Sequence, residues 1–94
     1  MTAQSDIHST VAAVWRMESA RLIAVLARML RDVGQAEELA QDALVKALER
    51  WPLEGVPDNP AAWLTTVGKR SAIDQLRRRE LQARKHEDFG HELE

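Results

Sequence analysis

Basic side chains gather in one short stretch of this sequence, "WLTTVGKRSAIDQLRRRE", at residues 63–80. An arginine fork donates two parallel hydrogen bonds that fit the oxygens of a phosphate. Arg70, Asp74 and Arg77 are spaced i, i+4 and i+7, so a helix would place them on one face, with Asp74 paired to the arginines. Two further arginines flank this face, namely Arg78 and Arg79. The chemistry indicated is binding of a phosphate-rich partner, and the alternative is a solvated helix face without a partner.

The charge of the chain is unevenly distributed. The formal net charge of the 94 residues is -2, yet residues 60–85 carry seven basic and two acidic side chains. The rest of the chain is therefore strongly acidic. This polarity predicts two surfaces with different tasks, one for an anionic partner and one for a basic or polar partner.

Catalytic and metal-binding patterns are not evident. The segment "HEDFGHE" holds two histidines, but His86 and His91 are five residues apart, whereas the zinc-protease motif needs them at i and i+4 on one helix face. The sequence has no cysteine, so disulfides, thiolate metal ligands and thiol nucleophiles are excluded. It also has no glycine-rich phosphate loop and no nucleophile elbow. We therefore expect neither an enzyme, nor a metal site, nor a cofactor.

The elements that must position the basic stretch are expected to be helices. Leu, Ala, Glu and Arg dominate the composition, and a chain of this length can bury only one modest core. No segment reads as a membrane span or a secretory signal, so a cytoplasmic all-α domain is expected. Apolar spacing predicts helices at about residues 5–33, 35–51 and 59–82, with residues 83–94 as a linker or disordered tail.

Boundary signals accompany these helices. Gly34 is expected to end the first helix. The acidic pair Glu37 and Glu38 then falls in the first turn of the second helix, where partial positive charge collects. Asn59 followed by Pro60 predicts the start of the third helix, with the asparagine as N-cap, after a loop at residues 52–59.

The second helix is predicted to have two different faces. At 100° per residue, its apolar positions fall on one side and are expected to be buried. They are Ala36, Leu39, Ala40, Ala43, Leu44, Ala47 and Trp51. The opposite side is a polar strip made of Glu38, Gln41, Asp42, Val45 and Glu49. Val45 interrupts its polarity, so the strip is either a contact surface or a solvated face with one stray valine.

The third helix shows a less regular pattern. Trp63, Leu64 and Val67 define an apolar stripe, but Ile73 and Leu76 point more than a quarter-turn away from it. The stripe is therefore predicted to change phase near Gly68, where a close approach or a bend would let the two halves pack against different neighbours. The position of Trp63 within the stripe favours a core role over base stacking.

The combination of these segments resembles a known family. "DVGQAEELAQDALVKALERW" (residues 32–51) followed by "NPAAWLTTVGKRSAIDQLRRRE" (residues 59–80) is similar to region 2 of bacterial RNA polymerase sigma factors of the extracytoplasmic-function (ECF) class. "WPLEGVPDNPAAWL" further resembles a subgroup with a long C-terminal extension. The likeness covers about residues 7–82 and implies a compact bundle of three to four helices, a sigma region 2 domain at residues 1–82.

The resemblance implies two tasks for such a domain. The second helix would dock on the clamp helices of the largest subunit of core RNA polymerase, which would explain the exposed valine. The implied contacts are Glu38, Gln41, Asp42 and Val45. The third helix and the loop before it would recognise the promoter minus-ten element and capture its melted non-template strand. An anti-sigma factor or another regulator would be a further partner.

The DNA contacts are likewise implied by the resemblance. They are Asn59, Lys69, Arg70, Arg77 and Arg78, with Asp74 as organiser, and a loop that forms a pocket for a flipped base, Glu54, Gly55, Val56 and Asp58. Arg70 stands where many relatives have asparagine, and Glu54 where an apolar or aromatic residue is frequent, so their base preference does not carry over. The region 4 helix-turn-helix is not in this sequence, so we expect an excised domain that binds promoters weakly by itself.

Two rival interpretations stay open. A stand-alone helical DNA-binding transcriptional regulator would insert a recognition helix into intact duplex. A plain protein-interaction bundle would use the basic helix only as a solvated face.

Overall fold

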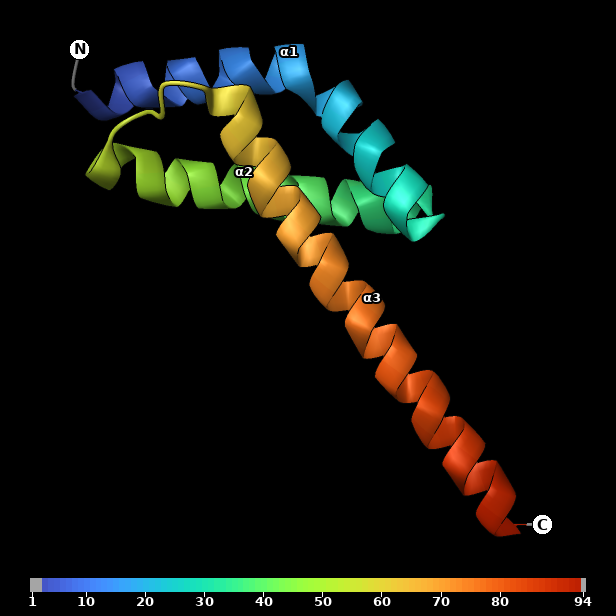
Figure 1. The fold of residues 1–94 in the computed structure, drawn as a ribbon. Coiled ribbons are helices and arrows are strands. Elements are labelled where there is room, and N and C mark those ends of the chain that lie inside the picture. Colours follow the sequence, from blue (N-terminus) through green and yellow to red (C-terminus); the bar gives the residue numbers. More distant parts are fainter. Residues whose placement is uncertain (1–2, 94) are drawn as a thin grey trace.

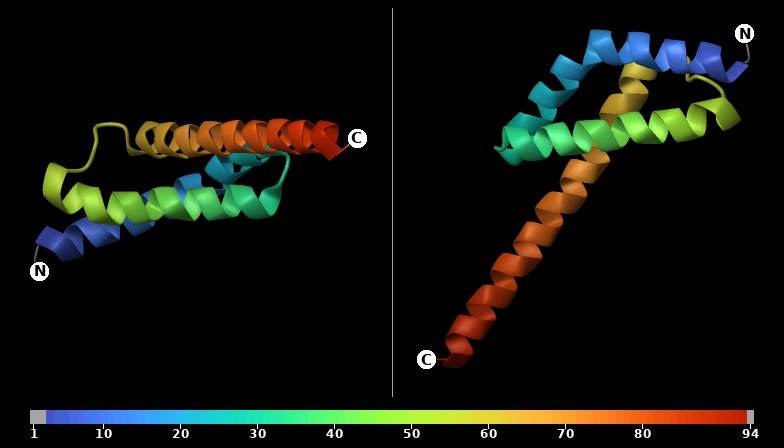
Figure 2. Two further views of the ribbon diagram at one scale, coloured as in Figure 1. Left: turned by 90° about the horizontal axis from the view of Figure 1, so that it is seen from below. Right: turned by 180° about the vertical axis from the view of Figure 1, so that it is seen from behind.

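The computed structural model describes the backbone of residues 3–93 and the side chains of residues 6–87. It consists of three helices, α1 (Ala3–Leu30), α2 (Val33–Glu54) and α3 (Pro60–Leu93). Helices α1 and α2 run antiparallel, and α3 crosses them and projects beyond them (Figure 1). The views from below and behind show α3 as a layer on one face of this pair (Figure 2). Within residues 3–93 there is no strand, which confirms the all-α prediction.

The connection between α1 and α2 lies earlier in the chain than predicted, at residues 31–32. Helix α1 ends at Leu30, and Arg31 takes a left-handed backbone conformation with φ of 55°. Asp32 then caps α2, because its Oδ1 accepts a hydrogen bond from the Gln35 N–H at 3.0 Å. The capping carboxylate, rather than a glycine stop, therefore decides where α2 begins.

This start corrects three expectations from the sequence. Gly34 does not end α1 but lies inside the first turn of α2. Glu37 and Glu38 consequently fall beyond that turn and not within it, so their expected interaction with the positive end of the helix is lost. Val33, predicted as the last residue of the first helix, is instead 59% exposed at the start of α2.

Helix α2 also ends later than predicted. It continues through Pro52 to Glu54, and the Gly55 N–H donates to the Trp51 carbonyl at 2.9 Å to close the last turn. Gly55 has φ of 91°, a conformation that favours glycine. The loop is thereby reduced to residues 55–59. At its end Asn59 caps α3 as predicted, with its Oδ1 accepting from the Ala62 N–H at 3.0 Å.

The core lies where the three helices meet. Leu22 and Leu26 of α1 and Trp51 of α2 have the largest fully buried side chains. The buried face of α2 is otherwise made of small residues, Ala36, Ala40, Ala43 and Ala47, as predicted, while Leu39 and Leu44 are half-buried at its edges. The Trp51 and Trp63 rings meet edge to face, with centroids 5.3 Å apart, so Trp63 belongs to the packing as expected.

The buried stripe of α3 does not change phase. Leu64, Gly68 and Ala72 are spaced four residues apart and are all buried. A Cβ atom on Gly68 would lie 3.1 Å from Cδ1 of Leu22, so the glycine permits α3 to approach α1 closely. Ile73 is 42% exposed and joins no second core. The prediction of two halves with different neighbours was wrong, because Ile73 is not a core residue and Leu76 is half-buried against the same core.

Helix α3 continues past residue 82, where a linker or disordered tail was expected. Side chains from Glu80 to Glu87 are all exposed, and this projecting part, residues 80–93, is named the α3 arm. Its first six residues, Glu80 to Lys85, are all good helix formers, which favours a helix there without tertiary packing. Arg84 also pairs with Glu80 one turn earlier at 2.7 Å. The extents of 66 × 24 × 19 Å reflect this projection.

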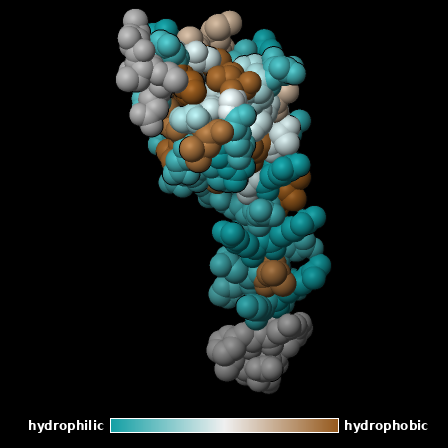
Figure 3. Space-filling view, turned by 90° about the vertical axis from the view of Figure 1, so that its left-hand side faces the viewer, coloured by the Kyte–Doolittle hydropathy of each residue, from teal (hydrophilic) through white to brown (hydrophobic). Residues whose placement is uncertain are grey.

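On the face shown in Figure 3, most of the surface is polar, with several apolar side chains among the polar ones. None of the helices within residues 3–93 combines the length and the apolarity needed to cross a membrane.

Candidate nucleic-acid interface

The basic side chains of α3 are available to a partner. Lys69, Arg70, Arg77 and Arg78 are all exposed. They lie on a helix that Gly68 and Ala72 anchor in the core. The backbone that carries these cations is therefore held in place by packing against the core.

Two adjoining hollows lie between α2 and α3 and form what we call the α2–α3 groove. One, of about 240 Å³, is lined by Leu39, Asp42, Lys46, Ser71, Asp74, Gln75 and Arg78. The other, of about 200 Å³, is lined by Lys46, Arg50, Val67, Arg70, Ser71 and Asp74. Of the predicted DNA contacts, the structure brings Arg70 and Arg78 together at this groove. Asn59 lies far from them, at the start of α3.

Asp74 does not organise the arginines as the sequence suggested. Between residues 6 and 87, the ion pair that the structure contains joins Arg84 to Glu80 on the α3 arm. Asp74 instead lines both hollows of the α2–α3 groove beside Lys46. Helical spacing brought Asp74 to the correct face, but it does not by itself bring the charged atoms into contact.

Arg79 has a different role from its neighbours. It is half-buried, and its Nη1 donates to the Leu30 carbonyl at 3.1 Å. Its Nη2 donates to Oε1 of Gln35, which also accepts from Nε2 of Gln75. Arg79 thus satisfies the last carbonyl of α1 and ties it to α2 and α3. The expectation that Arg79 flanks the DNA-binding face was wrong, and its spacing of seven residues from buried Ala72 was the missed signal.

The polar strip of α2 is exposed as predicted. Glu38, Gln41 and Asp42 are exposed, and so is Val45, at 49%. Asp42 also lines the α2–α3 groove. The two surfaces that the charge distribution predicted are therefore neighbours along one edge of α2.

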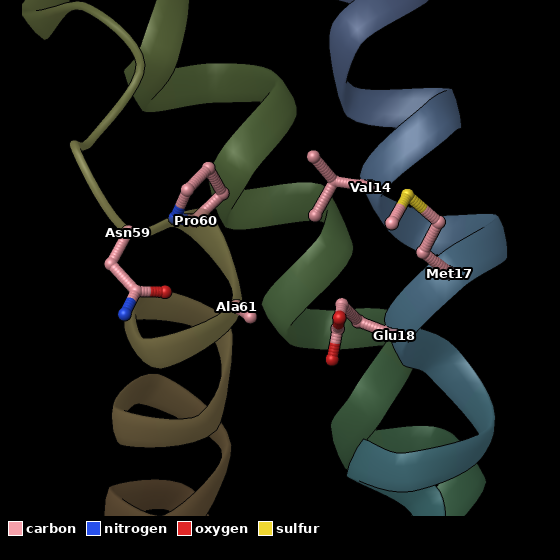
Figure 4. Close-up of a pocket in the computed structure, with 6 residues that line it drawn as sticks. All are labelled: Val14, Met17, Glu18, Asn59, Pro60 and Ala61. Atoms are coloured by element: carbon pink, nitrogen blue, oxygen red, sulfur yellow. The ribbon is translucent and has the colours of Figure 1, made fainter.

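A smaller hollow of about 160 Å³ lies between α1 and the start of α3 (Figure 4). It is lined by Val14, Met17, Glu18, Asn59, Pro60 and Ala61. Of the residues predicted to contact DNA, only Asn59 lines this hollow. The predicted loop residues Glu54, Gly55, Val56 and Asp58 are exposed but do not line it. Met17 was not predicted as a site residue, and its apolar side chain, between Arg16 and Glu18, is 77% exposed.

The fold and these surfaces define a small all-α domain with an anchored cationic helix. The family model described as Sigma-70 region 2 matches residues 14–82, and the chain therefore belongs to the sigma-70 region 2 family. This confirms the family resemblance drawn from the sequence.

The named relatives are ECF sigma factors. The chain is 32% identical over 92 residues to the ECF RNA polymerase sigma factor SigK of Mycobacterium sp. (strain KMS), covering 94% of this chain and 46% of the relative. It is 34% identical over 70 residues to the probable ECF RNA polymerase sigma factor SigI of Mycobacterium tuberculosis (strain CDC 1551 / Oshkosh), covering 74% of this chain and 23% of that protein.

A third relative, an uncharacterized protein of Rhizobium meliloti (strain 1021), is 49% identical over 53 residues, covering 56% of this chain and 12% of the relative. The chain thus spans about half the length of SigK and a smaller share of the other two relatives. The long C-terminal extension stays a prediction. No solved structure matches the chain significantly.

Proposed function

We propose that this chain is the sigma-factor domain that binds core RNA polymerase and captures the melted non-template strand of the minus-ten promoter element in transcription initiation. Membership of the sigma-70 region 2 family supports the general role. The proposal of strand capture rests on the exposed cations of α3, a helix that is itself fixed in the core. Phosphates would bind these cations with release of counterions. Capture of a single strand is a binding effect, so no bond is broken.

DNA binding is tested by fluorescence titration of the chain with single-stranded minus-ten oligonucleotides, compared with matched duplex. We expect the non-template single strand to bind more tightly, with affinity that falls steeply as salt rises. Arg77→Ala should flatten the slope of log K against log salt by about 0.7, the share of one phosphate contact on a single strand. Arg28→Ala, which removes the same charge from an exposed site on α1, is the matched control.

Two results would favour the rival functions instead. Tighter binding to duplex than to single strand would indicate a stand-alone helical regulator. If alanine at Arg70 and Arg77 left binding to every partner unchanged, the basic helix would be only a solvated face of an interaction bundle.

Polymerase docking is proposed for the polar strip of α2. It is supported by the exposure of Val45 among Glu38, Gln41 and Asp42, because an apolar residue inside a polar strip suits a protein contact. Asp42→Lys combined with Gln41→Ala should weaken binding to the clamp helices in a pull-down. A matched control is Glu87→Lys, the same charge reversal on the exposed α3 arm. Affinity equal to that of the unmodified chain would contradict this docking surface.

A base pocket is proposed for the loop at Glu54, Gly55, Val56 and Asp58, together with Asn59. Its support is the neighbouring hollow in Figure 4, whose apolar wall of Val14, Met17 and Pro60 suits the face of a base. Binding there would offset the few kcal/mol needed to extrude a base. Oligonucleotides varied at each position of the minus-ten element test this, and equal affinity for all of them would exclude the pocket.

A further inference from the structure

The wall that α2 contributes to the α2–α3 groove carries two basic residues besides Leu39 and Asp42. Lys46 lines both hollows, and Arg50 lines the hollow that also contains Arg70 of α3. Neither α2 residue was considered for DNA binding from the sequence, because the exposed side of α2 was interpreted as an acidic surface for polymerase. The fold turns this one edge of α2 toward α3.

The charges of the groove favour an anion. Four basic side chains, Lys46, Arg50, Arg70 and Arg78, line it together with the carboxylates of Asp42 and Asp74. Over residues 6–87 the recorded ion pair is the distant one between Arg84 and Glu80, so these four cations have no carboxylate within 4.0 Å. Cations that face each other across a groove repel, and a bound anion relieves that repulsion. Ser71, which lines both hollows, adds a hydroxyl donor.

The groove is small and lies at the surface. Its hollows measure about 240 and 200 Å³, below the roughly 300–1,000 Å³ of typical small-ligand pockets. Hollows of this size suit single phosphate groups, and the single strand as their source follows from the proposed function rather than from the size. The two hollows share Lys46, Ser71 and Asp74, so successive phosphates of one strand can occupy them in turn.

We propose that the α2–α3 groove is a track for the phosphates of single-stranded DNA, with Lys46 and Arg50 of α2 acting opposite Arg70 and Arg78 of α3. This inference rests on the proposed function and adds two phosphate-binding residues to it. Helix α2 then serves both partners: its polar strip faces polymerase, and its Lys46–Arg50 edge faces the captured strand.

The test is a titration of the whole chain with a fluorescein-labelled single-stranded minus-ten oligonucleotide over a range of salt. The variant is Lys46→Ala with Arg50→Ala. We expect the slope of log K against log salt to flatten by about 1.4, since each phosphate contact on a single strand contributes about 0.7. At about 0.15 M salt this corresponds to an affinity loss of roughly tenfold. Lys46→Arg with Arg50→Lys should retain most of the affinity.

The matched control is Arg21→Ala with Arg28→Ala, which removes the same charge from exposed sites on α1. It should leave the slope nearly unchanged. If both double variants flattened the slope equally, the effect would come from net charge alone, and the proposal would be overturned. Circular dichroism checks folding, and Lys46→Gln with Arg50→Gln replaces the alanine pair if that pair fails to fold.

Two further outcomes separate this proposal from the one on which it rests. Unchanged strand binding by the Lys46 and Arg50 variant, with weaker binding to the clamp helices, would assign both cations to polymerase and overturn the groove proposal alone. If the unmodified chain does not prefer single strand to duplex, the proposed function fails, and the groove proposal fails with it.

Discussion

Arg79 provides the sharpest test of the packing, because it joins all three helices through hydrogen bonds. Arg79→Ala removes the bond to the Leu30 carbonyl at 3.1 Å and the bond to Oε1 of Gln35. Hydrogen bonds from charged donors contribute about 1.5–3 kcal/mol each, and the half-buried position of Arg79 allows water to compensate part of this. We therefore expect the free energy of unfolding to fall by about 2 kcal/mol in total.

The assay is urea and thermal unfolding followed by circular dichroism. For a domain of this size, a loss of 2 kcal/mol lowers Tm by roughly 8–16 °C. Arg78→Ala is the matched control, since it removes the same charge from the adjacent exposed residue and should change stability by less than about 0.5 kcal/mol. Arg79→Lys keeps the charge but not the fork, so it should lose about half as much as alanine.

A double-mutant cycle identifies the partner of Arg79. Combining Arg79→Ala with Gln35→Ala should cost less than the sum of the single changes, with a coupling of about 1 kcal/mol. If Arg79→Ala proves no more destabilising than Arg78→Ala, the network does not hold the helices together, and the reasoning is refuted.

The remaining predictions concern single sites. Leu26→Ala should lower the free energy of unfolding by about 2–5 kcal/mol, because Leu26 is fully buried; a urea midpoint near that of the unmodified chain would contradict this. Asn59→Ala should cost about 0.5–2 kcal/mol in the same assay through the lost cap of α3, while Asn59→Asp keeps the cap, so equal losses would argue against capping. Glu80→Gln should lower the free energy of unfolding by less than about 0.5 kcal/mol, because its pair with Arg84 is exposed; a larger loss would contradict the solvent exposure of this pair.

Local signals predicted the parts of the fold that depend on one helix at a time. The alanines at positions 36, 40, 43 and 47 repeat at helical spacing, and no competing pattern interferes, so the buried face of α2 was predicted well. Asn59 with Pro60 marked the start of α3 for the same reason. The α1–α2 boundary was predicted incorrectly because Asp32 and Gly34 are both turn formers. Only the capping hydrogen bond shows that Asp32 precedes the first turn of α2.

Features that depend on contacts between helices were not predictable from a helical wheel. Ile73 was assigned to a core because it is apolar, although the fold gives it no neighbouring helix. Arg79 was assigned to the surface because it is charged, although two helix ends offer it acceptors. The α2–α3 groove and the hollow beside Met17 each combine residues from two helices, so neither exists as a pattern within one segment.

The α3 arm amplifies any change in the angle at which α3 leaves the core. From Glu80 to Leu93 the helix rises about 1.5 Å per residue, so this part extends roughly 20 Å beyond its last anchor at Arg79. A rotation of 10° at that anchor would move the far end by about 3–4 Å, while the buried residues near it would shift by much less. A small change of angle at Arg79 would thus displace the far end of the α3 arm much more than the residues of the core.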